Sequence, residues 1–173
     1  MRVASFVLLS IAGWHTALAQ DAGQRWPVPG VTAPTTELAL ELHVEISPAV
    51  VIGETSHGTR QFIPITGGRF VGANGLKGEV MSGGADWQLR RPDGATEVTA
   101  IYSIRTDDGV VIEVDNRGLI VPPGEGTAAY VRTAPRFHAP RGPYEWLNKT
   151  TFVGTISPSP QGGAVIIRVF KVL

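Results

Sequence analysis

The sequence contains no cysteine, and this absence limits the chemistry that the protein can perform. Disulfides, catalytic thiolates and cysteine-bound metals are all excluded, so packing alone has to hold the fold together. The histidines His43, His57 and His138 also lack the spacing of a metal-binding motif. Motifs typical of serine hydrolases and nucleotide-binding proteins are missing as well. We therefore predict no metal and no cofactor.

An excess of one charge and a long hydrophobic run are also missing. The chain has 15 Lys and Arg against 15 Asp and Glu. No basic field is available to attract nucleic acid or an anionic membrane surface. No apolar run approaches the roughly 20 residues that a transmembrane helix needs. The sequence thus argues against nucleic acid and membranes as partners.

The N-terminal region predicts export. Residues 1–19 (MRVASFVLLSIAGWHTALA) have one basic residue, an apolar core of about ten residues and a small-residue site at 17–19, which is typical of a secretory signal peptide. Residues 20–36 (QDAGQRWPVPGVTAPTT) are rich in proline and glycine and predict a flexible leader. Residues 37–173 are long enough for one domain with a core of its own. We expect an exported protein, either periplasmic or extracellular.

A period of two dominates the rest of the chain. Residues 37–46 (ELALELHVEI) alternate polar and apolar side chains, which predicts a strand with one wet face. Similar short runs recur to the C-terminus. Only residues 143–149 (PYEWLNK) suggest a single helical turn. The runs are separated by turn motifs at Gly67-Gly68, Pro92-Asp93-Gly94, Asp107-Asp108-Gly109, Asn116-Arg117-Gly118 and Gln161-Gly162-Gly163.

About ten strands joined by hairpins form a meander, which usually closes so that no edge stays exposed. We predict an all-β fold, a closed antiparallel up-and-down β-barrel of about 8–10 strands, with room inside for side chains or one small ligand. A two-sheet β-sandwich is the alternative, because alternation alone does not distinguish the two. Glycines inside or beside strands indicate sharp barrel corners.

The stretch GGADWQLRRPDG, residues 83–94, contains the first candidate for chemistry. On a regular strand Asp86 lies on one face, while Trp87 and Leu89 share the other. Packing of Trp87 and Leu89 in the core would leave Asp86 in water, as a solvated residue or a turn cap. A bulge at Gly83-Gly84 could instead turn Asp86 inward, toward a ligand. The direction of Asp86 therefore decides whether it can act in catalysis.

Tyr102 and two arginines are the next candidates. The face of its strand that carries Tyr102 is otherwise mostly apolar, so its hydroxyl should enter the interior and meet a structural partner or a ligand. Arg60 and Arg132 are either surface cations or, at a barrel mouth, binders of a carboxylate or enolate oxygen. An arginine paired with Asp86 would instead have a structural role.

Trp146 and Asn148 lie near the C-terminus. On an extended chain they share one face, so an indole and an amide could line one side of a cavity. Core packing is the alternative role for Trp146. Asn148-Lys149-Thr150 is also an N-glycosylation sequon, which matters only in a eukaryotic source and at an exposed site.

Six ordered motifs give the sequence a family resemblance: GETSHGTR, PITGGRF, LKGEVMSGGADWQLRRPDG, YSIRTDDG, YVRTAPRF and YEWLNKTTFVG. From about Leu38 to the C-terminus the chain resembles the DUF3237 family, also called UPF0311. The resemblance implies a small closed β-barrel in a family named for its unknown function. By motif, the recurrent polar positions of the family fall here on Arg60, Asp86, Tyr102, Arg132, Trp146 and Asn148.

These observations lead to two functional hypotheses, an enzyme and a carrier, and the sequence does not decide between them. The first is a secreted barrel that binds an oxygenated, partly apolar or aromatic metabolite and acts as a cofactor-free isomerase or cyclase. In it Asp86 exchanges a proton, Arg60 or Tyr102 stabilises an oxyanion, and the substrate-binding residues are Trp146, Asn148 and Arg132. The alternative is a non-catalytic carrier with a structural Asp–Arg pair. Assembly into a homo-oligomer is left open.

Overall fold

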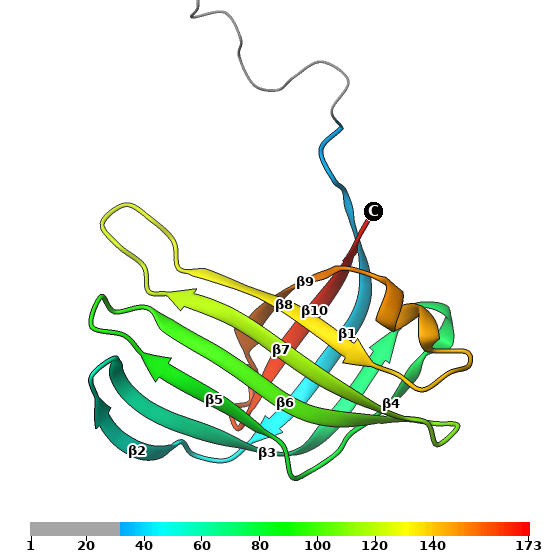
Figure 1. Ribbon diagram of the computed structural model, residues 1–173, viewed down its shortest axis with the longest axis horizontal. Helices are drawn as coiled ribbons and strands as arrows, with labels where there is room; N and C mark the ends of the chain where they lie inside the picture. The colour runs from blue at the N-terminus through cyan, green and yellow to red at the C-terminus, as the bar shows by residue number, and fades with distance from the viewer. Residues whose placement is uncertain (1–31) are drawn as a thin grey trace, which may run out of the picture. The chain divides into compact units, whose positions relative to one another are not determined.

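The computed structural model describes residues 32–173, and strands make up most of them (Figure 1). The signal peptide predicted at 1–19 and most of the leader predicted at 20–36 lie outside the described residues. The first strand begins at Thr36. Within residues 32–173, no helix has the length and apolar character needed to span a bilayer.

Ten strands and two short 3₁₀ helices follow one another along the chain. Helix η1 (Ala73–Gly75) lies between β3 and β4, and η2 (Glu145–Lys149) lies between β8 and β9. The strands are β1 (Thr36–Ile46), β2 (Val50–Thr55), β3 (Gly58–Gly72), β4 (Lys77–Val80), β5 (Ala85–Arg90), β6 (Thr96–Thr106), β7 (Val111–Val121), β8 (Tyr130–His138), β9 (Phe152–Pro158) and β10 (Ala164–Val172).

Antiparallel pairing closes the sheet into a barrel. Pairing runs from β1 through β10, β9, β8, β7 and β6 to β4 and β5, then to β3, which pairs back with β1. β4 and β5 lie one after the other between β6 and β3, so they count as one strand of the ring. In the same way, β2 pairs with β3 beyond the part of β3 that pairs with β1. The ring therefore has eight strand positions. The predicted up-and-down barrel is confirmed, and the sandwich alternative is wrong.

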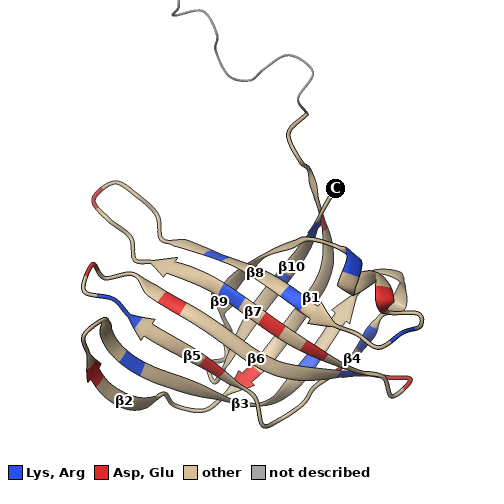
Figure 2. Cartoon of the chain, in the orientation of Figure 1, with Lys and Arg blue, Asp and Glu red and all other residues tan. Residues whose placement is uncertain are grey.

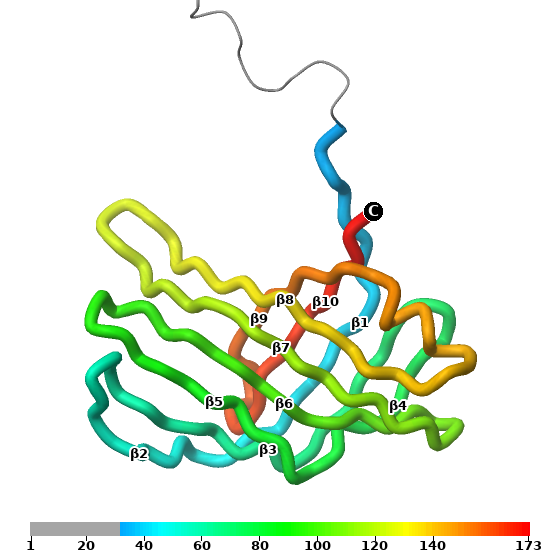
Figure 3. Tube along the Cα trace, viewed as in Figure 1, coloured from blue at the N-terminus to red at the C-terminus, as the bar shows by residue number. Residues whose placement is uncertain are grey.

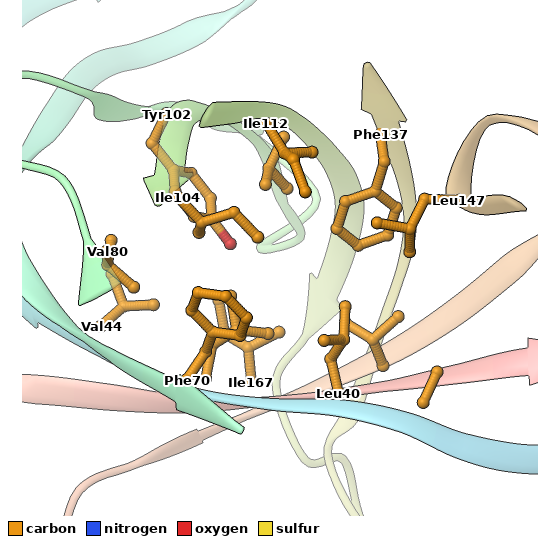
Figure 4. Packing of buried hydrophobic residues seen from close by; sticks show 14 of the residues in the cluster. Leu40, Val44, Phe70, Val80, Tyr102, Ile104, Ile112, Phe137, Leu147 and Ile167 are labelled. Carbon is orange, nitrogen blue, oxygen red and sulfur yellow. The ribbon is translucent and has the colours of Figure 1, made fainter. Parts of the chain in front are cut away.

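Strand alternation places every second side chain inside the barrel. Figure 3 traces the long strands β6, β7 and β8 side by side, and their buried residues recur at every second position. Toward β4 the interior is apolar (Figure 4), and its largest fully buried side chains include Leu40, Phe70, Ile104, Ile112 and Leu147. The interior toward β5 is more polar, because Gln61, Gln88 and Asn116 are buried there.

The break between β4 and β5 preserves this alternation. β4 ends with Val80 opposite Ile104, and β5 begins with Ala85 opposite Ile101. Between these two pairs one side of the ladder advances five positions and the other advances three. The strand that carries β4 and β5 therefore has two more residues here than β6. Because two is an even number, the alternation between inner and outer faces is not inverted, and Val80 and Asp86 both point inward.

Three of the predicted turns connect strands, namely those at 92–94, 107–109 and 161–163. The other two predicted turns are wrong, because Gly67-Gly68 lies within β3 and Asn116-Arg117-Gly118 lies within β7. Glycine serves close packing there: a Cβ at Gly68 or Gly118 would lie 2.0 or 2.5 Å from a carbonyl oxygen of the neighbouring strand. The curvature of a closed barrel therefore explains these glycines better than a hairpin does.

A substitution at Gly84 tests whether close packing just before β5 requires glycine. A Cβ at this position would lie 2.4 Å from the Cβ of Tyr102 and 2.7 Å from the carbonyl oxygen of Ile101. We expect Gly84→Ala to lower the free energy of unfolding by about 1–3 kcal/mol, as overpacking does, measured by urea denaturation. The control is Gly124→Ala, whose Cβ would meet only the hydroxyl of Thr127, at 3.1 Å. Equal losses in the two variants would contradict the packing argument.

Candidate ligand cavity

The barrel encloses a cavity of about 120 Å³ in its more polar half. Apolar side chains of β1, β3, β6, β7, β9 and β10 form most of its wall. Its polar side chains are Asp86, Gln88, Tyr102 and Asn116. A mostly apolar hollow with a few converging polar groups is the usual form of a small-molecule site.

A chain of amides holds one oxygen of the Asp86 carboxylate. Gln61 Nε2 donates a hydrogen bond of 2.6 Å to Gln88 Oε1. Gln88 Nε2 in turn donates a hydrogen bond of 2.6 Å to Asp86 Oδ2. The second oxygen, Asp86 Oδ1, is buried and has no hydrogen-bond partner among the described residues. The carboxylate is therefore fixed on one side and free on the other.

Burial dominates the electrostatics of this carboxylate. It raises the pKa of Asp86, while the Gln88 amide and the Thr99 backbone act in the opposite direction. The ion pairs formed within residues 32–173 do not include Asp86. Burial and the nearby Asp86 charge also raise the pKa of Tyr102, whose hydroxyl points into the barrel in Figure 4. Tyr102 is therefore a hydrogen-bond donor at neutral pH.

The direction of Asp86 differs from the prediction based on Trp87. Trp87 is 40% exposed and lies on the outer face of β5, where its ring centroid is 4.9 Å from that of Phe62. Asp86 and Gln88 occupy the inner face. The prediction that Trp87 packs in the core and leaves Asp86 in water is wrong. The residues of β5 were assigned correctly to two faces. The face assumed to be buried is the outer one, where Trp87 packs against Phe62.

Asn116 and Gln88 are polar cavity residues that were not predicted as site residues, and Asn116 was assigned to a turn. Asn116 is 1% exposed, and its Oδ1 has no hydrogen-bond partner among the described residues. It lies opposite Ala100 in the middle of β7. Asn-Arg-Gly resembles a turn, which concealed the position. Alternation would have found it, since Ile112 and Val114 are buried on the same face.

Neither predicted arginine lies at this cavity. Arg60 pairs with Leu89 in the register, next to Gln61, so it belongs to the outer face of β3. Arg132 is exposed; its Nη1 donates a hydrogen bond of 2.7 Å to its neighbour's carbonyl oxygen, and its guanidinium lies 5.6 Å from the ring of Tyr130. The structure thus brings neither Arg60 nor Arg132 to Asp86. The alternative of a structural pair with Asp86 is not formed by the described residues.

Trp146 and Asn148 also lie away from the cavity. Both belong to helix η2 rather than to an extended chain, so the predicted common face does not form. Trp146 packs against the core, with its ring centroid 6.1 Å from that of Phe152. Asn148 binds Ala139 at both backbone groups: it accepts from the N–H at 2.8 Å and donates to the carbonyl oxygen at 2.7 Å. These two hydrogen bonds hold η2 against the segment that follows β8.

A larger hollow of about 590 Å³ lies at the same place, between β8, η2 and the start of β9. Asn148 lines it together with Arg136 and His138. β8 and β9 are paired in register only at Thr133 and Gly154, so the sheet is weakly joined beside this hollow. Within residues 32–173, no three acidic or histidine side chains are grouped as a metal site would require.

The Asn148 clamp can be tested directly. We expect Asn148→Ala to lower the free energy of unfolding by about 1–3 kcal/mol, because both backbone groups of Ala139 lose a partly buried partner. Urea denaturation measures the loss. Lys149→Ala serves as the control, since its ion pair with Glu145 is exposed and worth at most about 1 kcal/mol. A loss no larger than that of the control would contradict a structural role for Asn148.

The fold and the cavity define a class, that of small closed β-barrels with an internal ligand-sized cavity. Within this class the chain belongs to the DUF3237 family, whose model, "Protein of unknown function (DUF3237)", matches residues 34–172. The resemblance inferred from the motifs is therefore confirmed. UPF0311 protein RPA1785 from Rhodopseudomonas palustris is 35% identical over 150 residues, which cover 80% of this chain and 96% of that protein.

Solved structures share the whole barrel. The crystal structure of RPA1785 matches with a TM-score of 0.74 at 32% identity, over 83% of this chain and all of that one (100%). A beta-barrel like protein from Acinetobacter baumannii gives 0.71 at 29%, over 82% and 99% of the two chains. An enzyme from Penicillium herquei gives 0.67 at 26%, over 83% and 97%. The same architecture thus occurs in at least one enzyme.

Proposed function

We propose that this protein is an exported barrel that binds a small, oxygenated, partly apolar molecule, and that Asp86 exchanges a proton with it in a cofactor-free isomerisation or cyclisation. The observation that carries the proposal is the Asp86 carboxylate at the cavity, whose Oδ2 is held by Gln88 and whose Oδ1 has no hydrogen-bond partner within residues 32–173. A carboxylate that served only the fold would have both oxygens satisfied.

The surroundings of Asp86 suit general acid–base chemistry. A proton carrier works best when its pKa lies near the operating pH, and burial moves the pKa of Asp86 upward from its ordinary acidic value. Gln88 fixes the orientation of the carboxylate, and the apolar walls limit the access of water. In this mechanism Asp86 takes the proton and the ligand oxygen accepts a hydrogen bond from Tyr102, the oxyanion partner that shares the cavity.

Three further points support the proposal. The enzyme from Penicillium herquei has the same barrel, which is compatible with catalysis in this fold. The signal peptide predicted at 1–19 supports export, to the periplasm or the exterior. Figure 2 shows acidic and basic residues interspersed along the strands, without the single-sign field that would favour nucleic acid.

A carrier that binds the same molecule without converting it is the alternative, and proton exchange distinguishes the two. Cyclohexanone in D₂O is a suitable one-ring probe, because exchange of its α-protons needs a base at the ring. We expect the wild-type protein to accelerate this exchange and Asp86→Asn to lose at least about tenfold of the acceleration, measured by NMR. Asp115→Asn on the outer face of β7 should keep it. Equal rates for wild type, Asp86→Asn and buffer would favour the carrier.

The stability of Asp86→Asn is a second, independent test. Because burial raises the folded-state pKa of Asp86, its contribution to stability is fully present below pH 3.8 and is lost as the pH rises through the folded value. We therefore expect Asp86→Asn to melt at a higher temperature than wild type at pH 7, with the difference disappearing near pH 3. Thermal denaturation followed by circular dichroism measures both.

The matched control for this stability test is again Asp115→Asn, which removes an ion pair with Arg117 at 2.9 Å. It should leave stability at pH 7 unchanged or lower it by at most about 1 kcal/mol. A melting temperature of Asp86→Asn that lies below that of wild type at pH 7 would show that the carboxylate stabilises the fold. The proposed functional role would then lose its main support.

A further inference from the structure

Two buried oxygens that lack a hydrogen-bond partner in the described part of the chain belong to residues lining the same cavity. They are Asp86 Oδ1 and Asn116 Oδ1, which come from strands separated by β6. Folded proteins leave few such groups, because each one costs about 1–3 kcal/mol when it is removed from water without a partner. Their presence on one small cavity indicates a shared partner that residues 32–173 do not supply.

The chemistry of the two groups specifies that partner. A carboxylate and an amide carbonyl oxygen both accept hydrogen bonds, so the ligand must carry a donor. The amide nitrogen of Asn116 can in turn donate to an oxygen of the ligand. A hydroxyl group satisfies all of these demands, because it donates one hydrogen bond and accepts others.

The charge of the cavity restricts the ligand further. Among the residues that the structure describes, no lysine or arginine lines the cavity, and Asp86 is the acidic residue in its wall. A carboxylate or phosphate on the ligand would place a second negative charge beside Asp86 in an apolar surrounding, where repulsion is strong. An anionic ligand is therefore excluded, and the mostly apolar wall also disfavours a cation, which would lose its hydration there, so the bound molecule is neutral. This differs from the expectation that an arginine binds a carboxylate or enolate oxygen.

Volume limits the size of the ligand. The cavity holds about 120 Å³, which is close to the roughly 150 Å³ of an apolar protein cavity that takes up benzene. The wall is mostly isoleucine and valine, such as Ile63, Ile156 and Val165, which suit the faces of one ring. A fused polycyclic molecule would need the cavity to expand.

From donor, charge and size we infer that the cavity binds a neutral one-ring compound with a hydroxyl group, a phenol or an enol, and that Asn116 is the residue that positions its oxygen beside Asp86. This inference rests on the proposed function, since it concerns the same cavity. It adds the ligand class and a positioning residue that the family motifs do not include.

Binding of simple probes to the full chain tests the inference. Phenol, fluorobenzene and benzoate share one ring and differ in donor and charge. We expect phenol to bind at least about tenfold more tightly than fluorobenzene, and benzoate to bind more weakly than either. Calorimetry gives the affinities. The methyl NMR shifts of Ile156 and Val165, which line the cavity, show whether binding occurs there.

A variant then assigns the role to Asn116. Asn116→Leu has a similar shape and no polar atoms, so it should weaken phenol binding about tenfold and leave fluorobenzene unchanged. Asp115→Asn, on the neighbouring outer position, should alter neither. The ranking of the three probes on wild-type protein needs no variant, so it tests the ligand class even if Asn116→Leu does not fold.

The outcomes separate the inference from the proposed function. Equal affinity for phenol and fluorobenzene, or tightest binding of benzoate, would overturn the ligand class and leave a binding cavity intact. Loss of phenol and fluorobenzene binding together in a folded Asn116→Leu would overturn the positioning role. If no probe shifts the Ile156 and Val165 methyls, the cavity is not a binding site, and the proposed function fails with the inference.

Discussion

The return of β3 to β1 is the constraint on which the rest of the structure depends. β3 has 15 residues; its second half pairs with β1 and β4, and its first half pairs with β2 and β5. One strand serves four neighbours because two shorter strands follow each other along each of its edges. Gly68 lies where a Cβ would meet the backbone of β1 at 2.0 Å, which makes the close approach feasible only for glycine. This closure gives every strand one inner and one outer face.

Closure also divides the interior into two parts with different chemistry. Toward β4, Leu40, Phe70 and Ile104 fill the space with apolar atoms. Toward β5, Gln61 donates one hydrogen bond to Gln88, while Asp86 and Asn116 each keep a buried oxygen that no described residue binds. Apolar side chains of similar size would stabilise this half better. Buried polar groups that cost stability, set in an otherwise apolar interior, are typical of a binding site.

The architecture followed from the sequence because alternation is a property of each strand alone. The alternating runs from residues 37–46 to the C-terminus, with turns such as those at 92–94 and 107–109, predict a closed meander. The failures come from features that depend on partner strands. A bulge between Leu38 and Leu40 leaves Leu38 47% exposed, although the period of two places it inside. The inner face of β5 could not be identified either, because Trp87 stacks with Phe62 outside the barrel.

The six polar residues suggested by the family motifs separate by position. Asp86 and Tyr102 line the cavity, whereas Arg60, Arg132, Trp146 and Asn148 lie outside it. A motif does not distinguish a residue that binds a ligand from one that fastens a helix, as Asn148 does at Ala139.

Asn116 was missed because its Asn-Arg-Gly motif is typical of a turn. Its spacing from Ile112 and Val114 correctly indicates the barrel interior. In a closed barrel the spacing is the stronger guide, because the backbone groups of β7 pair continuously with β6 and β8 and leave no freedom for a turn. Gly118 follows two residues later for a packing reason, where the backbone of β8 approaches too closely for a side chain. In this part of β7, Asn116 therefore contributes a polar side chain to the cavity, and Gly118 allows the backbone of β8 to pack closely.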